Sequence, residues 1–508
     1  MRSLISGLSI VGVLAQPADL KTSVSAWVDA HQSQIVGELL DALAIPNVAA
    51  DQPNIRRNAE HLRGLLTRHG FRSEILETTG NPLVYGALDV AGATRTVLFY
   101  CHYDGQPVDA KAWKQPDPFT PVLRRGRMED QPATADPKSV SRYDPDFRIY
   151  ARSASDDKAP IVALLAAVDA LKASGLAPSS NVRIILDGEE EDSSPSLVPA
   201  IARYKDKLRA DLMVILDGPV HSSGRPTVVY GGRGIVTVDL TVFGPRSGVH
   251  SGNYGNWIPN PAMRLASLLA SMKDEDGRVR VAGYYDAVAP LTPAERAMLD
   301  AVPEDTGRML RTFGVAEPEK AFPNLQDALQ VPTLNIRGLA SAFVGANART
   351  IVPDRATAAI DIRLVKETSP ADLIAKLRAH IEQQGYHLVD PSTELRAGAP
   401  DDATRAKYGK LAQLTVVGQM INAFRTSTSD PRAQALVAAV TTAFGQPPVQ
   451  LRTLGGTVPI APFIEALGFP AMLVPTVNFD NNQHEENENL RLGTFFDSIV
   501  TIAAVLRQ

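Results

Sequence analysis

Cysteine is almost absent from this sequence, which has one, Cys101, in 508 residues. A disulfide within the chain and a CxxC zinc site are therefore both excluded, so any bound metal must be held by His, Asp and Glu. Runs of Lys and Arg, and basic patches interleaved with aromatics, are also missing, and the formal net charge is -5. We therefore expect no nucleic-acid partner.

Long hydrophobic runs are scarce too. The clearest lies at residues 4–14, after Arg2, and leads into Val13-Leu14-Ala15 before Gln16; it is typical of a secretory signal with a small-residue cleavage site. It is too short to span a bilayer, and no other segment approaches that length, so we expect no membrane partner. We predict a signal peptide at residues 1–15 and a periplasmic or secreted protein. An ordinary apolar first helix in a cytoplasmic protein is the alternative.

The remaining composition, 44% hydrophobic and 21% charged, is typical of a globular protein, and the length allows two or three domains. Nearly continuous apolar strands are predicted at 94–105, 181–191 and 211–218, with an apolar helix at 159–175. Such strands separated by helices indicate an α/β domain with a mostly parallel sheet covered on both faces.

The pattern changes near residue 231. Apolar and polar residues alternate at 234–244 and 355–365, which predicts strands with one solvated face, and 372–385 is an amphipathic helix. We therefore predict an inserted α+β domain at 231–425 within a main domain formed by 16–230 and 426–508. A polar, proline-containing loop is expected at 126–148.

Acidic residues follow a buried strand in the stretch VRIILDGEEEDSS, residues 182–194. Like charges repel, and carboxylates at the end of a core strand are costly to desolvate, so a multivalent cation would explain them. His102, Glu190, Glu191 and Asp217 all lie where ligands bind in parallel sheets, at carboxyl ends of strands. Each has a structural alternative, such as a core histidine or a solvated loop. Together they offer oxygen and imidazole ligands suited to Zn or Mn.

Five motifs, in this order, resemble those of the M20 metallopeptidases. HYDGQPVD resembles their HxD motif, SASDDKAP their GASDDKGP, LDGEEEDSS their EGxEExGS, ILDG their later aspartate strand and QHEENENL their HxxNE. The resemblance covers most of the chain, and the long insert points to the dipeptidase and carboxypeptidase branch. It departs from the family where three glycines become Ala151, Ser153 and Ala159, which leaves the shape of the pocket open.

The resemblance implies two divalent metal ions per subunit, zinc in the first place, with manganese or cobalt as alternatives. One ion would be held by His102, Asp156 and Asp217, and the other by Asp156, Glu191 and His484. Glu190 corresponds to the general base, and Asp104 to a residue that orients the His102 ring.

The resemblance also implies that the insert is a lid and dimerisation domain. His250, in GVHSGNYG, corresponds to a histidine that polarises the scissile carbonyl in the partner's site, which implies a homodimer. A surface histidine on a monomer is the alternative. Substrate-binding roles fall on Arg363, Gly455, Gly456 and Thr457, which would grip a C-terminal carboxylate; for Arg363 a structural salt bridge is the alternative.

We therefore expect a dimetal exopeptidase that hydrolyses dipeptides or short peptides with a free C-terminal carboxylate. An aminoacylase acting on N-acyl amino acids is the alternative on the same scaffold. A catalytically dead binding module is a third reading, against which the retention of Glu190 and all five ligands argues.

Overall fold

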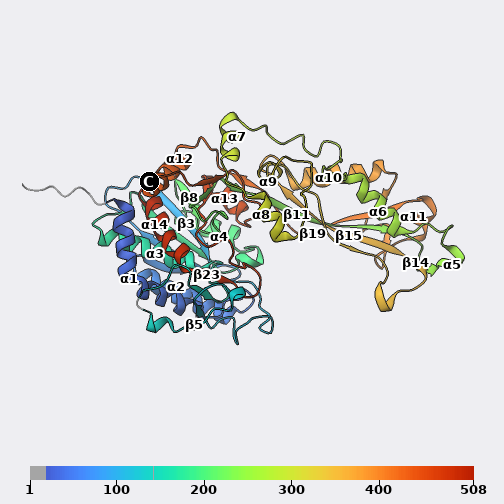
Figure 1. Cartoon of the computed structure of the whole chain (residues 1–508). Helices are drawn as coiled ribbons and strands as arrows, with labels where there is room; N and C mark the ends of the chain where they lie inside the picture. Colours follow the sequence, from blue (N-terminus) through green and yellow to red (C-terminus); the bar gives the residue numbers. More distant parts are fainter. Residues whose placement is uncertain (1–18, 141) are drawn as a thin grey trace, which may run out of the picture.

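The computed structural model describes residues 19–140 and 142–508, which form a main lobe and an elongated lid (Figure 1). The signal peptide expected at 1–15 lies outside the described residues and stays a prediction. Within these ranges, no helix combines the length and the apolar character needed to cross a membrane.

Among the described residues, eight strands form the main sheet. The four central strands run parallel to one another, whereas the pairs β1–β2, β2–β7 and β22–β9 are antiparallel. The sheet order is β1 (Arg72–Leu76), β2 (Leu83–Leu88), β7 (Asn181–Asp187), β3 (Thr96–His102), β8 (Leu212–Ile215), β22 (Ala471–Leu473), β9 (Thr227–Val229) and β21 (Val449–Leu451).

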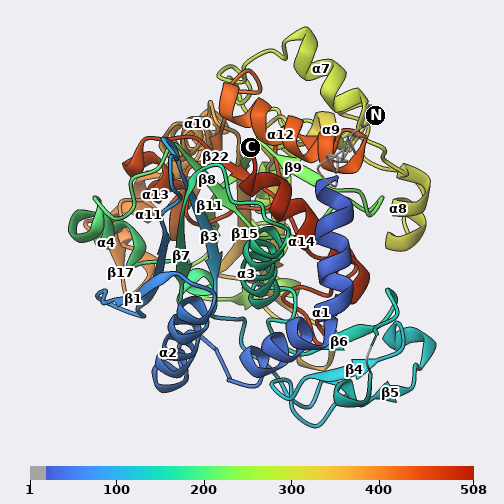
Figure 2. The ribbon, with the colours of Figure 1, turned by 90° about the vertical axis from the view of Figure 1, so that its left-hand side faces the viewer.

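Both faces of this sheet are buried. Successive side chains of a strand point to opposite faces, so neighbouring residues of one strand join different clusters. In β3, Phe99 and Cys101 join one hydrophobic cluster, while Leu98 and Tyr100 join another. The first cluster lies under helices that Figure 2 shows side by side. They are α1 (Leu20–Leu43), α3 (Lys158–Ala173) and α14 (Leu492–Leu506), with α12 (Pro431–Phe444) and α2 (Gln52–Arg68) beside them. The second cluster includes residues of α4 (Leu197–Tyr204) and α13 (Ala461–Leu467). The predicted α/β class with covered faces is confirmed.

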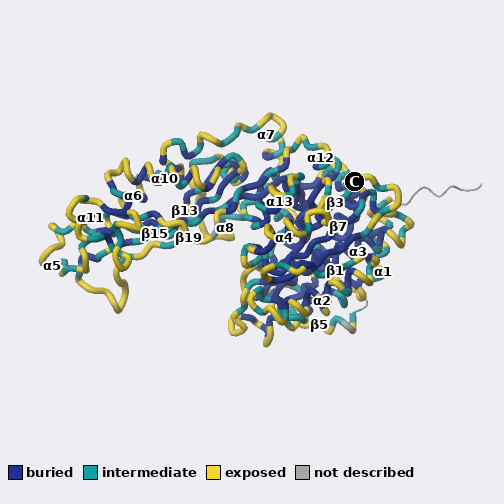
Figure 3. Tube along the Cα trace, turned by 180° about the vertical axis from the view of Figure 1, so that it is seen from behind, coloured by how far each residue is buried: buried dark blue, intermediate teal, exposed yellow. Residues whose placement is uncertain are grey.

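The lid is built on a second sheet, whose order is β13 (Asn335–Ala340), β15 (Arg355–Leu364), β11 (Gly234–Phe243), β19 (Leu411–Ile421) and β16 (His387–Leu388). Alternate residues of β11 and β15 are buried against α6 (Pro261–Met272) and α10 (Pro370–Gln383), as their period-two pattern predicts. The far half of the lid is largely exposed (Figure 3). At its distal end lie β12 (Val249–His250), α5 (Ser251–Tyr254) and β14 (Ile351–Val352).

The two lobes are joined by a two-stranded ladder between β10 (Gly231–Gly232) and β20 (Phe424–Arg425). Glycine is required here, because a Cβ atom on Gly231 would lie 2.1 Å from the Phe424 carbonyl oxygen. The same holds for Gly234, where a Cβ would lie 2.3 Å from the Ile421 oxygen. The crossing strands therefore approach each other more closely than side chains would allow.

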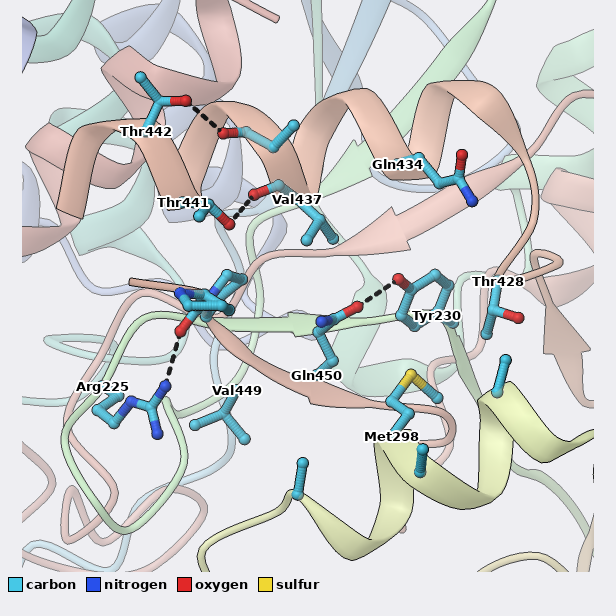
Figure 4. A pocket seen from close by; sticks show the side chains of 16 residues that line it. Arg225, Tyr230, Met298, Thr428, Gln434, Val437, Thr441, Thr442, Val449 and Gln450 are labelled. Carbon is cyan, nitrogen blue, oxygen red and sulfur yellow. Dashed lines mark hydrogen bonds between the residues drawn. The ribbon is translucent and has the colours of Figure 1, made fainter. Parts of the chain in front are cut away.

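Part of the insert does not belong to the lid sheet. The segment containing α7 (Pro293–Asp300), α8 (Thr306–Phe313) and α9 (Leu325–Ala328) runs back over the main lobe. There Arg452 donates to Glu295 at 2.7 Å and to Gln330 at 2.8 Å. A cavity of about 970 Å³ remains between α7 and α12, with Tyr230 and Gln450 on its floor (Figure 4).

The stretch 126–148 differs from the expected loop. It contains β5 (Thr134–Ala135), which pairs with β4 (Val122–Arg124), and β6 (Arg148–Tyr150) begins at its end. With β23 (Asn489–Arg491) these strands form a small four-stranded sheet. Strands of two or three residues are too short for a periodic pattern, so they had no signal in the sequence.

Candidate active site

Residues from five segments meet at the carboxyl edge of the main sheet. His102 is the last residue of β3, Asp217 follows the end of β8 by two residues, and Glu191 lies in a short 3-10 helix, Glu190–Asp192, after β7. Asp156 lies two residues before the start of α3, and His484 comes from the loop before β23. Parallel neighbouring strands end on the same edge, which is why residues so distant in sequence converge.

Two groups of potential metal ligands result. In one, His102, Asp156 and Asp217 have ligand atoms within 4.8 Å of one another; in the other, Asp156, Glu191 and His484 do. Asp156 belongs to both, because its Oδ1 lies 2.9 Å from His102 Nε2 and its Oδ2 lies 3.1 Å from His484 Nε2. These are the two sets that the sequence predicts as metal ligands; that they hold metal stays a prediction.

The arrangement of these atoms fits divalent cations. Asp156 Oδ2 is buried and accepts no hydrogen bond, although two ligand atoms of its group surround it. His484 Nε2 lies 3.1 Å from this oxygen and 3.5 Å from Glu191 Oε2. Nitrogen and oxygen ligands of one tetrahedral zinc ion lie about 3.3–3.6 Å apart. The donor set and its spacing are therefore those of a cation site.

The electrostatics of this cluster are unfavourable for its carboxylates. Burial, followed by the charge of Asp156, raises the pKa of Glu191 to about 7 and that of Asp217 to about 6. Burial and the neighbouring carboxylates Asp217 and Glu191 also raise the pKa of Glu190. Bound cations reverse such shifts, because they favour the ionised carboxylates.

Asp104 ties two parts of the site together. Its two carboxylate oxygens accept hydrogen bonds from the backbone N–H groups of Glu190 and Glu191, both at 3.0 Å. Its Oδ1 also lies 3.4 Å from His102 Nδ1. The sequence suggested the contact with the His102 ring, but not the anchoring of the Glu190–Glu191 backbone.

Glu488 is a site residue that our sequence reasoning missed. It is fully buried, and its carboxylate accepts hydrogen bonds from the backbone N–H groups of Ser153, Ser155 and Asp156, each at 2.9 Å. Arg152 donates to it as well, at 2.8 Å. Glu488 thus fixes the loop that carries Asp156. The available signal was the final glutamate of the HxxNE motif, from which we used only the histidine.

The altered glycine positions are accommodated locally. Ser153 has a φ of 63°, a left-handed conformation that favours glycine. The Ser153 hydroxyl accepts a hydrogen bond from Asn47 Nδ2 at 2.9 Å. A Cβ atom on Gly105 would lie 2.3 Å from the same hydroxyl oxygen. The side chain added at Ser153 therefore occupies space that Gly105 leaves free.

Arg363 lies beside the metal-ligand groups, in a cavity of about 510 Å³. Its Nη1 donates to Thr457 Oγ1 at 2.7 Å, so a lid strand and a main-lobe loop meet across the cavity. Gly456 lines this cavity, together with Glu190, whereas Gly455 packs toward Leu329. No carboxylate pairs with Arg363 among the described ion pairs, which argues against a structural salt bridge.

His250 is not brought to this cluster. It is exposed and caps α5, where its Nδ1 accepts from the N–H of Gly252 at 3.1 Å. Figure 1 places α5 at the distal end of the lid, far from the main lobe. Within one chain, His250 therefore takes no part in the site.

Most of the chain matches a known peptidase family. Residues 130–508 match Peptidase family M20/M25/M40. The chain is 25% identical to the Beta-Ala-His dipeptidase of Mus musculus, over 94% of this chain and 93% of the relative. It is also 25% identical to the Cys-Gly metallodipeptidase DUG1 of Candida albicans, over 94% and 95%. The crystal structure of an M20 family metallo-carboxypeptidase from Sulfolobus solfataricus superposes with a TM-score of 0.73 at 26% identity, covering 93% of this chain and 98% of that one. The chain is an enzyme of the metallopeptidase class, and it belongs to peptidase family M20/M25/M40.

Proposed function

We propose that this enzyme is a dimetal-dependent exopeptidase that hydrolyses dipeptides and short peptides at the residue carrying the free carboxylate. One observation carries the proposal: a single cavity is lined by residues of both metal-ligand groups, by Glu190 and by the Arg363–Thr457 pair. The names of the relatives, a dipeptidase for Beta-Ala-His and one for Cys-Gly, agree with a dipeptide substrate.

His102, Asp156 and Asp217 would hold one cation, and Asp156, Glu191 and His484 the other. When bound, two such cations polarise a carbonyl and acidify water. The cavity has room for a dipeptide, since ligand pockets of this kind measure about 300–1,000 Å³. Zinc fits the donor set, and manganese or cobalt are compatible with the same ligands.

Glu190 is placed to act as the general base. It lines the cavity, it belongs to neither metal-ligand group, and its backbone is held by Asp104. In this role its carboxylate takes a proton from water and delivers it to the leaving amine. Arg363 would hold the substrate's carboxylate, because a guanidinium can bind it with two parallel hydrogen bonds.

The test is Glu190→Gln, with Asp192→Asn, an exposed residue of the same loop, as the control. We expect Glu190→Gln to lower kcat on dipeptides by about two orders of magnitude or more, while metal content stays unchanged. Asp192→Asn should retain activity. A Glu190→Gln enzyme with wild-type kcat would show that Glu190 is not the base.

An amidohydrolase acting on N-acyl amino acids remains the second candidate, because Arg363 would grip the carboxylate of either substrate. A panel of dipeptides and N-acetyl amino acids, assayed with Zn, Mn and Co, separates the two. Higher kcat/KM for the N-acetyl series would favour the amidohydrolase.

We further propose a homodimer in which His250 completes the partner's site. Two features support it: His250 is remote from the cluster of its own chain, and the edge strand β13 is exposed along nearly its whole length. Ile336 and Leu339 on this strand are both exposed, and unpaired apolar edges are avoided in monomers.

Mixing two inactive variants, His250→Ala and Glu190→Gln, tests this assembly. After chain exchange, about half of the dimers would be mixed, and each would contain one site with an intact Glu190 and the partner's His250. About a quarter of wild-type activity should then return. If exchange is demonstrated and no activity returns, His250 does not act across an interface.

A further inference from the structure

Three lid residues form a row across the end of the lid sheet. In the antiparallel register, Arg363 of β15 lies opposite Ile235 of β11, and Ile235 lies opposite Ile421 of β19. Side chains at directly opposed positions of antiparallel strands point to the same face and contact one another. Because Val236 and Val238 point toward α6 and α10, the row points to the other face, away from the lid core.

This face looks into the active-site cavity. Arg363, Ile235 and Ile421 all line it, and the main lobe adds Leu454 and Val458 on either side of Thr457. The guanidinium that would hold the carboxylate therefore adjoins an apolar wall of four aliphatic side chains. No charged side chain interrupts this wall among the cavity residues next to Arg363, since the acidic ones belong to the metal-ligand end or to Glu190.

From this row we infer that the enzyme selects substrates whose carboxylate-bearing residue has a branched or large apolar side chain. The inference rests on the proposed function, in which Arg363 binds the carboxylate. With the carboxylate on Arg363, the side chain of the same residue is within reach of Ile235 and Ile421. Water is displaced from aliphatic surface when that side chain is Leu, Ile or Val, whereas an amide or a charge at this place loses hydration without a partner.

The discriminating comparison is between leucine and asparagine, which have nearly the same shape. We expect kcat/KM for Ala-Leu to exceed that for Ala-Asn and Ala-Gly by about 10- to 100-fold, as expected for burying a leucine side chain. The same order should hold for N-acetyl-Leu, N-acetyl-Asn and N-acetyl-Gly if the enzyme cleaves those instead.

Ile235→Ala is the variant that tests the row, because Ile235 is its middle member. It should lower kcat/KM for Ala-Leu by about 5- to 20-fold more than kcat/KM for Ala-Gly. Val198→Ala, an exposed aliphatic residue on α4, is the matched control and should change neither. Thermal unfolding of both variants reports whether they fold.

A readout on the wild-type enzyme keeps the test decisive if Ile235→Ala does not fold. Free leucine, as a product, should inhibit with a Ki about tenfold or more below those of asparagine and glycine. Equal kcat/KM for Leu, Asn and Gly substrates, or equal inhibition by the three amino acids, overturns the inference while the proposed function stands. No hydrolysis of any dipeptide or N-acetyl amino acid overturns both.

Discussion

The main lobe and the lid use their sheets differently. The main sheet is buried on both faces, and buried carboxylates near its carboxyl edge accept backbone hydrogen bonds, Asp104 from Glu190 and Glu488 from Asp156. The lid sheet has one core face, under α6 and α10, and its edge strand β13 is left exposed. The main lobe thus contains both metal-ligand groups and Glu190, whereas the lid contributes one wall of the cavity, including Arg363, and an uncovered edge.

The difference shows where sequence changes should matter. In the main lobe, loss of one buried polar contact should disturb both stability and the site, because the same residues serve both. In the lid, stability should depend on a single apolar face. Four changes test this contrast, in order of decreasing effect.

Glu488→Ala should have the largest effect. It leaves the buried Arg152 without its ion pair and removes the acceptor for three backbone N–H groups, so we expect a loss of about 3–5 kcal/mol. Urea unfolding measures it, and metal content should fall as well because Asp156 loses its support. Glu485→Ala, exposed in the same loop, should stay within about 0.5 kcal/mol. Equal stability of the two variants would refute the role of Glu488.

Leu240→Ala should destabilise the lid by about 2–5 kcal/mol, because Leu240 is fully buried in the middle of β11. Val416→Ala, 39% exposed on the neighbouring strand β19, should cost about 0.5 kcal/mol or less. Urea unfolding of both variants provides the comparison. Similar losses would mean that the lid has a second buried face.

His69→Gln should destabilise the main lobe in a pH-dependent way. Burial would lower the pKa of His69, but hydrogen bonds to Asp169 and Glu38 outweigh it and raise the pKa to about 9. The folded-state pKa lies above the unfolded value of about 6.5, so the stabilisation is fully present below pH 6.5 and is lost as pH rises through 9. We expect about 1–2 kcal/mol after allowance for solvent screening, since both partners are partly exposed.

The check is the difference in free energy of unfolding between wild type and His69→Gln at pH 6 and at pH 10. It should be large at pH 6 and shrink at pH 10. A difference that does not depend on pH would show that the ring contributes by packing alone.

Ser193→Gly should have the smallest effect, and a stabilising one. Ser193 has a φ of 70°, where a residue with a Cβ atom loses about 1–2 kcal/mol relative to glycine. The greater freedom of glycine in the unfolded chain offsets about 0.4–1 kcal/mol of this gain, so we expect about 0.5 kcal/mol in net stability. Ser193→Ala keeps the Cβ atom and should bring no gain in Tm. Equal gains in both variants would locate the effect in the hydroxyl group.

Much of this architecture was predictable, because the governing patterns are local. The main-sheet strands expected within 94–105 and 181–191 follow from nearly continuous apolar runs, and the lid strands follow from two-residue alternation; both are confirmed. The convergence of His102, Asp156, Glu191, Asp217 and His484 followed from strand ends together with the family motifs. The signal peptide, the domain boundaries and the roles of the site residues stay predictions.

The unpredicted features depend on contacts between segments remote in sequence. Glu488 acts through backbone N–H groups about 333 residues away, and a carboxylate that binds backbone looks in sequence like any solvated glutamate. The packing of α7 against the main lobe includes the hydrogen bond from Arg452 to Glu295. The row formed by Arg363, Ile235 and Ile421 depends on the register between strands remote in sequence, which no local pattern shows.

The shape of the active-site cavity depends on the angle between the two lobes, which the ladder between β10 and β20 joins. One wall belongs to the lid and the other to the main lobe, so any rotation about this pair of strands would change the distance from Arg363 to Glu190. The strands cross closely at the glycines, and the Arg452–Glu295 contact near α7 is a second link between the insert and the main lobe. A ligand that contacts both walls would therefore hold the lid against the main lobe. The flexibility of the β10–β20 ladder would then set how sharply the enzyme discriminates between substrate lengths.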